Sequence, residues 1–486
     1  MWYNNLVAFE RLIMDYFIVF INQVDTWIWG IPMILILTSS HLFSTVRTGF
    51  IQLKIPLAIK LSFTKDPDAE GDISQFGALC TALSGTLGVG CIVGVATAII
   101  YGGPGAVFWM WITGILGIGT KYAETYIAVK YRVKDSRGTM CGGAMYVWDY
   151  AFRRKKKGET EESNPWWAHL GAILFAVFAM VATLGIGSSV QASAISESLA
   201  YYFPLTPQWI FAIIIVAVTA FTIFGGVKAI AKICEGLVPF MTVAYIIGTI
   251  ILIVVNGENF IPAIAMIFRC AFTPEAAFGG AVGSGFAAAL QYGMARGLFS
   301  NEAGLGTAPI VASAAATKNP ARQSLVAMTG AFWSTVVVCF ITGIALVASL
   351  LSNPGLASAD AQTLTLQAFE QIPFVGGPIL CISLAMFAFS TIIGWSYYAD
   401  RAVTYLFGHK AVKIFFIIYL AAAFVGGAGF GDVIWAISDI MNAFMAIPNV
   451  IVVVLLSKVI GKETHDYVWE NNLDKPSNDK LRIVEH

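Results

Sequence analysis

Three glycine clusters interrupt otherwise apolar stretches of the chain. They are residues 84–91 (SGTLGVGC), 102–117 (GGPGAVFWMWITGILG) and 293–306 (GMARGLFSNEAGLG). A glycine inside a helix costs about 1 kcal/mol relative to alanine, so repeated glycines near one membrane span need a reason. A helix broken at the bilayer midplane supplies one, because its free backbone groups can bind a substrate and an ion. The pattern indicates binding by backbone groups and no covalent chemistry.

Two ionisable residues, Arg296 and Glu302, lie in the third cluster, within the predicted depth of the membrane. Charged groups at that depth are costly and are usually paired or functional. We expect Arg296 and Glu302 to pair across an unwound segment, as a gate or to fix the break. Lys121 and Glu124, three residues apart near a predicted cytoplasmic helix end, are interpreted as a structural pair.

The composition is that of a polytopic, all-α membrane protein. Of the 486 residues, 57% are hydrophobic and only 12% are charged, and the mean hydropathy is +0.74. The formal net charge is zero, so nothing indicates a nucleic acid partner. The seven cysteines lie mostly in apolar segments without CxxC spacing, which favours membrane-embedded side chains over a disulfide or zinc framework. The absence of an HExxH motif argues against an intramembrane metalloprotease.

Eleven apolar segments have the length of a membrane span. They are residues 24–46, 75–101, 104–131, 167–200, 208–225, 229–255, 280–317, 322–350, 376–407, 411–427 and 433–457. Segment 280–317 is too long for one straight span, which again indicates a break. The first residues show no cleaved signal peptide and predict a short interfacial helix. Residues 258–271 and 359–371 predict two further interfacial helices on connecting loops.

Lysine and arginine residues gather in alternate connections between these segments. The basic connections lie at residues 47–65, 134–157, 228–232, 318–322, 410–413 and 458–462. Segment 351–375 contains neither residue type, and segment 256–279 contains only Arg269. The positive-inside rule therefore places the N-terminus outside and the C-terminal tail in the cytoplasm. All eleven segments satisfy this alternation.

Ten spans remain when the first is set aside, and they divide into two sets of five. Because each half has an odd number of spans, the two halves have opposite orientations in the membrane. Each half also begins with a glycine-rich helix. Residues 84–90 and 300–306 share the pattern Ser-x-x-x-Gly-x-Gly. These features favour an inverted repeat. The predicted divisions are 1–72 (interfacial helix, extra span and loop), 73–256 (first repeat), 257–458 (second repeat) and 459–486 (cytoplasmic tail).

The stretches 102–117 and 296–310 (RGLFSNEAGLGTAPI) resemble the alanine or glycine:cation symporter family. This family belongs to the wider amino acid–polyamine–organocation group with the leucine-transporter fold, and the resemblance covers about residues 24–460. It implies an extra N-terminal helix followed by a 5+5 inverted repeat with two broken helices. It also implies sodium-coupled uptake of small neutral amino acids, chiefly alanine or glycine, across the inner (plasma) membrane of a prokaryotic cell.

One residue departs from the family pattern. Family members usually carry Asn after the first Gly-x-Gly, and here that position is Cys91. An amide offers an acceptor and two donors, whereas a thiol is a weak donor and a weak acceptor. We therefore expect that a second ion that relies on the amide is absent, and that one sodium is coupled to each substrate.

An amino acid zwitterion in mid-membrane must have both of its charges matched. Exposed N–H groups at Gly88 and Gly90 suit the carboxylate, and the carbonyl and hydroxyl of Thr86 suit the ammonium group. The alternative is that these glycines only allow close helix packing. The predicted substrate-binding set comprises Thr86, Gly88, Gly90, Cys91, Gln191, Met294, Leu298, Thr391 and Trp395.

The remaining members of that set have distinct expected roles. Thr391 and Trp395 are four residues apart and share a helix face, so Thr391 could contact the substrate while Trp395 closes the pocket. Met294 and Leu298 lie one turn apart on the long broken helix and are expected to limit side-chain size, or else only to pack between helices. Gln191 either reaches the substrate or bridges two helices.

The resemblance also implies a sodium site between the first and eighth core helices. The matching oxygens are the carbonyls of Ser84, Leu87 and Phe387 and the hydroxyls of Ser390 and Thr391. The alternative is that these hydroxyls bond back to the preceding helical turn.

These features predict a secondary active transporter, not an enzyme, with sodium as coupling ion, no other cofactor, and the lipid bilayer as its surroundings. The rivals are a proton-coupled or other neutral amino acid permease of the same fold, a channel, and a membrane enzyme. A channel would need a filter repeat. An enzyme would need a His/Asp/Glu cluster at depth. Neither is evident in the sequence.

Overall fold

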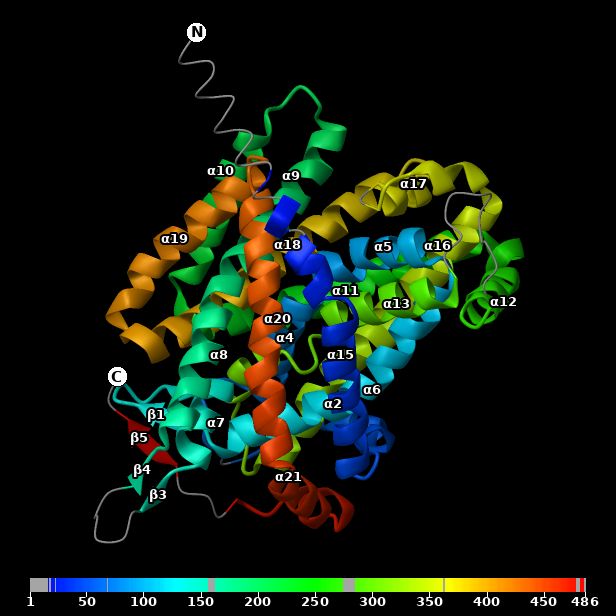
Figure 1. Ribbon diagram of the computed structural model, residues 1–486. Coiled ribbons are helices and arrows are strands. Elements are labelled where there is room, and N and C mark those ends of the chain that lie inside the picture. Colours follow the sequence, from blue (N-terminus) through cyan, green and yellow to red (C-terminus); the bar gives the residue numbers. More distant parts are fainter. Residues whose placement is uncertain are drawn as a thin grey trace.

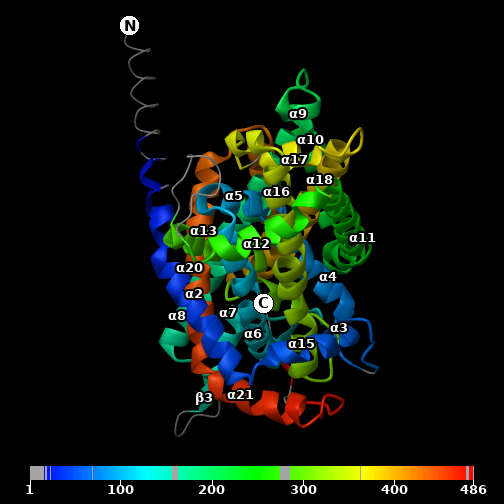
Figure 2. The same cartoon turned by 90° about the vertical axis from the view of Figure 1, so that its right-hand side faces the viewer.

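The computed structural model describes residues 16, 19–21, 23–67, 69–155, 162–273, 285–361, 363–477 and 481–484, the side chains of Lys155, Glu162 and Asp432 excepted. The interfacial helix that we expect at the N-terminus lies outside these residues. Within them the chain is predominantly helical, and long helices run side by side through most of the molecule (Figures 1 and 2).

The first half of the chain supplies the helices up to α11. They are α2 (Ile31–Arg47), η1 (Ile51–Lys54), α3 (Ile55–Ser62), α4 (Gln75–Thr86), η2 (Val89–Cys91), α5 (Val93–Gly102), α6 (Gly105–Lys130), α7 (Ala144–Ala151), α8 (Trp166–Leu184), η3 (Gly185–Ser189), α9 (Val190–Tyr202), α10 (Gln208–Ile223) and α11 (Gly226–Val255).

The second half supplies the remaining helices. They are η4 (Gly257–Asn259), α12 (Phe260–Cys270), α13 (Phe286–Asn301), α14 (Thr307–Ala312), α15 (Pro320–Ala331), η5 (Phe332–Cys339), α16 (Phe340–Ser352), η6 (Pro354–Ser358), α17 (Leu364–Phe369), α18 (Gly376–Phe407), α19 (Lys410–Gly427), α20 (Asp432–Leu455), α21 (Ser457–Thr464) and η7 (His465–Trp469). Helices α12 and α17 occupy the two stretches expected to be interfacial.

Seven helical stretches among the described residues are long and apolar enough to cross a membrane. They are Val19–Arg47, Trp166–Tyr202, Gly226–Val255, Pro320–Ser352, Gly376–Phe407, Lys410–Gly427 and Val433–Leu455. The chain is therefore a multi-pass membrane protein. The four other expected spans also fall on helices, namely α4–α5, α6, α10 and α13–α14. The count of eleven crossings and the inverted repeat stay predictions.

Both occurrences of the Ser-x-x-x-Gly-x-Gly pattern lie where a helix is broken. After α4 the chain forms the single turn η2 before α5 begins at Val93. After α13, Glu302, Gly304 and Gly306 adopt left-handed backbone angles, with φ of 52°, 87° and 80°. Such angles are ordinary for glycine but uncommon for other residues. The two glycines therefore allow the chain to leave the regular helix at this point. Arg296 lies within intact α13, not in the break.

Glycines bring α13 unusually close to α6. A side chain at Gly293 would come within 2.4 Å of the Ala106 carbonyl oxygen, and one at Gly297 within 3.0 Å of the Met110 carbonyl oxygen. Small residues at helix contacts are the usual means of close packing in membranes. The glycine-rich stretches therefore serve two purposes, since some glycines break helices and others let intact helices approach each other.

A single carboxylate holds the second break. Oε2 of Glu124, on α6, accepts hydrogen bonds from the backbone N–H groups of Gly304 at 3.1 Å and Gly306 at 3.2 Å, and from Nδ2 of Asn449 at 2.8 Å. Lys121 Nζ lies 3.8 Å from Glu124 Oε1 and donates to the Glu302 carbonyl oxygen at 3.2 Å. The expected Lys121–Glu124 pair is thus confirmed, although both side chains are fully buried.

The predicted C-terminal tail is packed against the helices. Glu463 accepts a hydrogen bond from the Tyr126 hydroxyl at 2.6 Å and lies 2.9 Å from Lys130 Nζ. The indole N–H of Trp469 donates to the Thr48 carbonyl oxygen at 3.0 Å. The predicted division at residue 459 therefore does not mark the start of a free extension.

Five short strands lie at the same end of the molecule as α21, opposite to α17 (Figure 1). Strand β1 (Val133–Asp135) pairs antiparallel with β2 (Met140–Cys141) and parallel with β5 (Arg482–Val484), and β3 (Arg154–Lys155) pairs antiparallel with β4 (Glu162–Ser163). The basic connections predict this end to be cytoplasmic.

We expect Glu124→Ala to destabilise the protein by about 3–5 kcal/mol, because it leaves the Lys121 ammonium and three buried donors without their acceptor. The apparent melting temperature in detergent, measured by thermal unfolding, should fall accordingly. Glu70→Ala is the matched control, because Glu70 makes only an exposed ion pair with Lys134 that contributes little. An equal effect of both substitutions would contradict this role for Glu124.

Candidate functional site

A cavity of about 530 Å³ runs from α17 and the end of α9 down to the first helix break. Its walls come from the break and α5, from η3 and α9, and from α13, α17, α18 and α20. The lining residues include Val89, Gly90, Val93, Gly94, Ile186, Val190, Gln191, Ala194, Arg296, Phe299, Leu366, Leu384, Trp435 and Asp439. Both its volume and its mixed apolar and polar lining are typical of small-molecule sites.

Polar groups converge at Gly88, on the first break. A side chain at this glycine would come within 2.7 Å of Thr391 Oγ1 and 3.4 Å of Gln191 Oε1, so only glycine fits. Gln191 is 4% exposed, and its Nε2 donates to the Ile186 carbonyl oxygen at 3.0 Å. Its Oε1 is buried and has no hydrogen-bond partner among the residues that the structure describes. A buried acceptor without a partner is costly unless a ligand or water provides the donor.

Four of the five residues expected at the sodium site lie within hydrogen-bonding distance of one another. The Thr391 hydroxyl donates to the carbonyl oxygens of Ser84 at 2.8 Å and Phe387 at 3.0 Å. The Ser390 hydroxyl donates to the Phe387 carbonyl oxygen at 2.8 Å. Both hydroxyls therefore bond back to the preceding turn, and that of Thr391 also joins α18 to α4. Leu87 is buried at the end of α4.

Cys91 links the two broken helices. Its Sγ lies 3.3 Å from the hydroxyl of Ser300, near the end of α13, and 3.5 Å from the Thr86 carbonyl oxygen. The Thr86 hydroxyl bonds back to the Ala82 carbonyl oxygen at 3.3 Å. These groups are buried, and neither Thr86 nor Cys91 lines the cavity.

The predicted substrate set is only partly brought together. Gly90 and Gln191 line the cavity, whereas Gly88 and Thr391 do not line it; Gly88 adjoins both Thr391 and Gln191. Met294, Leu298 and Trp395 are buried and do not line it. Trp395 packs instead against Gly187 and Gly85, where a side chain on either glycine would clash with it or press against it.

Phe299 of α13 supplies an apolar wall that the sequence analysis did not identify. Its ring lies 3.3 Å from the position that a side chain on Gly90 would occupy, and its centroid lies 6.4 Å from that of Trp29. No sequence signal separates Phe299 from the other aromatic residues, because which face of α13 meets the cavity depends on where the helix breaks.

The predicted pair between Arg296 and Glu302 is wrong. Arg296 lies on the cavity wall, where its electrostatic partners are Asp25 and Asp439. Glu302 accepts a hydrogen bond from the Thr307 hydroxyl at 2.6 Å and does not line the cavity. Isolated carboxylates in apolar segments are functional candidates by the membrane-cost argument, so Asp25 and Asp439 were detectable in the sequence.

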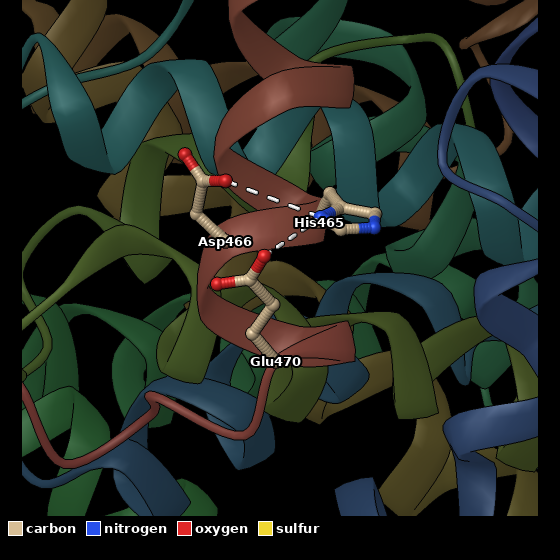
Figure 3. A group of neighbouring side chains, drawn as sticks. All are labelled: His465, Asp466 and Glu470. Carbon is tan, nitrogen blue, oxygen red and sulfur yellow. Dashed lines mark ion pairs between the residues drawn. The ribbon is translucent and has the colours of Figure 1, made fainter.

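His465, Asp466 and Glu470 form a group on η7 with the ligand types of a metal site (Figure 3). His465 Nδ1 lies 4.0 Å from Asp466 Oδ1 and 3.5 Å from Glu470 Oε1. All three side chains are about half exposed or more, so we interpret the group as surface ion pairs of small energetic weight.

Comparisons with known proteins show what this chain is similar to. Residues 14–480 match the model of the sodium:alanine symporter family. The chain is 43% identical over 455 residues to the sodium/alanine symporter AgcS of Methanococcus maripaludis, covering 92% of this chain and 96% of that protein. It is also 43% identical over 465 residues to an uncharacterized transporter of Haemophilus influenzae, covering 95% and 98%.

A solved structure shares the fold. It is the crystal structure of MhsT in complex with L-phenylalanine, which matches with a TM-score of 0.59 and 15% identity over 83% of this chain and 95% of that one. At this identity the likeness shows the fold alone.

The cavity predicts which side chains of α9 a water-soluble reagent can reach. Ala194 lines the cavity, whereas Ala192 on the same helix is fully buried. In intact cells, a charged, membrane-impermeant methanethiosulfonate should modify Ala194→Cys and leave Ala192→Cys unmodified, in a background without the seven native cysteines. Modification of Ala194→Cys only in inside-out vesicles would contradict the predicted orientation, and equal modification of both positions would contradict the cavity.

Proposed function

Because this chain belongs to the sodium:alanine symporter family, we propose that it imports a small neutral amino acid, alanine or glycine, together with sodium. The observation that carries the proposal is the oxygen of Gln191, a cavity residue, which has no partner among the described residues and adjoins Gly88. This acceptor suits an ammonium group, and broken-helix N–H groups suit a carboxylate. The description of AgcS as a sodium/alanine symporter supports alanine as substrate and sodium as coupling ion.

In this proposal the substrate carboxylate binds the N–H groups of Gly88 and Gly90, and its ammonium binds Gln191 Oε1 with the carbonyl of Thr86. Phe299 lies against Gly90 and is proposed to form the wall that limits the substrate side chain, which would favour alanine and glycine. Met294, Leu298 and Trp395 are proposed to support this wall from behind.

The sodium ion is proposed to bind where Thr391 joins α18 to α4. Its ligands would be the carbonyls of Ser84, Leu87 and Phe387 and the hydroxyls of Ser390 and Thr391. Both hydroxyls already lie against carbonyls of this set. A cation between these oxygens would hold α4 against α18 and so fix the backbone of Gly88, which adjoins Thr391 Oγ1. Ion and substrate would thus stabilise the same arrangement, which is the basis of coupling.

Transport is proposed to proceed by alternating access in the cell membrane of a prokaryote. The cavity would be the outward-facing route, since it opens at the α17 end, opposite to the basic connections. The packed tail lies at the other end. The two halves would rock or gate around the broken helices.

Ser390→Ala with Thr391→Val should abolish sodium-dependent alanine binding while leaving a folded protein, because two of about five oxygens around a desolvated ion are lost. The measurement is uptake against sodium concentration in proteoliposomes, with folding checked by size-exclusion chromatography. Ser396→Ala is the matched control, because its hydroxyl also bonds back to the preceding turn, at 2.6 Å from the Ile393 carbonyl oxygen, outside the proposed ligand set.

Wild-type uptake should follow sodium with a Hill slope near one, and Cys91→Ser should be tolerated, because the thiol is only a weak ligand. A slope near two would contradict single-sodium coupling. Uptake driven by a proton gradient without sodium, or sodium dependence retained in the double variant, would contradict the proposed ion site.

A further inference from the structure

Glu302 is a buried carboxyl group without an ion pair. It is 4% exposed and is the first residue of the second break. Among the described residues its carboxyl group accepts a hydrogen bond from the Thr307 hydroxyl at 2.6 Å, and the indole of Trp395 also lies beside it. Lys121 Nζ donates to the backbone carbonyl oxygen of Glu302 at 3.2 Å. An ionised carboxylate at this depth is costly when no cation or set of donors compensates it.

The nearest cation is already committed to another carboxylate. Lys121 Nζ lies 3.8 Å from Glu124 Oε1, and three donors surround Glu124 Oε2. These donors and the Lys121 ammonium surround Glu124, not Glu302. An ionised Glu302 would therefore have no cation of its own in a fully buried cluster.

The other titratable groups around the cluster do not supply the missing positive charge. His41 on α2 is fully buried, and the nearby Lys121 ammonium disfavours a second cation there. Its Nδ1 lies 2.9 Å from the Thr120 hydroxyl. From α18, Tyr398 lies within electrostatic range of Glu302, and its hydroxyl has no hydrogen-bond partner. A tyrosine can contribute only negative charge.

We propose that Glu302 is a proton-binding site, neutral in this conformation and ionised when the α21 end of the transporter opens to water. A neutral carboxyl group can donate its proton to the Thr307 hydroxyl across the unwound residues, at the distance observed. The proton then fastens the end of α13 to the start of α14. This inference rests on the proposed function only in assuming that the transporter changes conformation.

The cavity offers a reporter of that conformation that needs neither sodium nor substrate. Ala194→Cys is accessible in the conformation described here, so its modification rate measures the population of this conformation. Raising the pH should remove the Glu302 proton and so lower the population of this conformation. Because one proton is released, this population should fall by up to about tenfold per pH unit once Glu302 titrates. Glu302→Gln retains a donor for Thr307 and carries no charge, so it should hold this conformation at every pH.

The experiment measures the modification rate of Ala194→Cys between pH 6 and pH 9, with and without Glu302→Gln. Dividing the two rates cancels the intrinsic pH dependence of thiol reactivity and any titration of Asp25, Glu197 and Asp439 at the cavity. We expect the wild-type rate to fall relative to the Glu302→Gln rate as the pH rises. A ratio that does not change with pH would overturn the proposal, even if sodium-coupled uptake is established.

A second measurement covers the case in which Glu302→Gln does not fold. The infrared spectrum of the wild-type protein at neutral pH should contain the C=O band of a buried protonated carboxylic acid. This band should be weakened in Glu302→Asp, whose shorter side chain no longer reaches Thr307, and should persist in Glu70→Asp. Absence of the band from the wild type would overturn the proposal.

Discussion

The rest of the site depends on one carboxylate, because Oε2 of Glu124 accepts hydrogen bonds from two backbone N–H groups of the second break. An unwound segment inside a membrane leaves backbone groups that lipid cannot satisfy, so a break survives only where protein groups replace the lost helical hydrogen bonds. Glu124 does this for Gly304 and Gly306, while Lys121 satisfies the carbonyl of Glu302 and balances the charge. With this support α13 ends at Asn301, and Arg296 and Phe299 face the cavity.

The first break is held by different means. Thr391 donates to the carbonyl of Ser84, and Cys91 contacts Ser300 of α13, so the first broken helix is tied to α18 and to the second broken helix by neutral groups. Neutral contacts in a buried site are individually weak and are easily replaced by those of a bound ion or zwitterion. The second break is therefore the rigid support, and the first break is where ligand binding is proposed. This asymmetry agrees with the presence of the cavity at Gly90 and Gln191.

Much of the helical framework was predictable, because glycine clusters and apolar length are local properties of the sequence. The two breaks and the Lys121–Glu124 pair follow from such patterns, whereas the closeness of Ser84 to Thr391 was expected only from the family resemblance. The pairing of Arg296 was not predictable from its own segment, because Asp25 lies on the helical residues 23–28 before α2 and Asp439 lies on α20. The same holds for Asn449 at Glu124 and for the packing of Trp395 on Gly187, which depend on how distant helices meet. Whether Met294 and Leu298 limit substrate size likewise depends on the rotation of α13.

The central claim is that the first helix break, between α4 and α5 and next to α18, holds both the substrate and the ion. It is tested most directly by a structure of the purified protein determined with sodium and L-alanine at high resolution. The account predicts alanine density against Gly88, Gly90 and Gln191, and a sodium ion among the oxygens of Ser84, Phe387, Ser390 and Thr391. Alanine bound only at the cavity mouth, beside Asp25, Arg296 and Asp439, would contradict it.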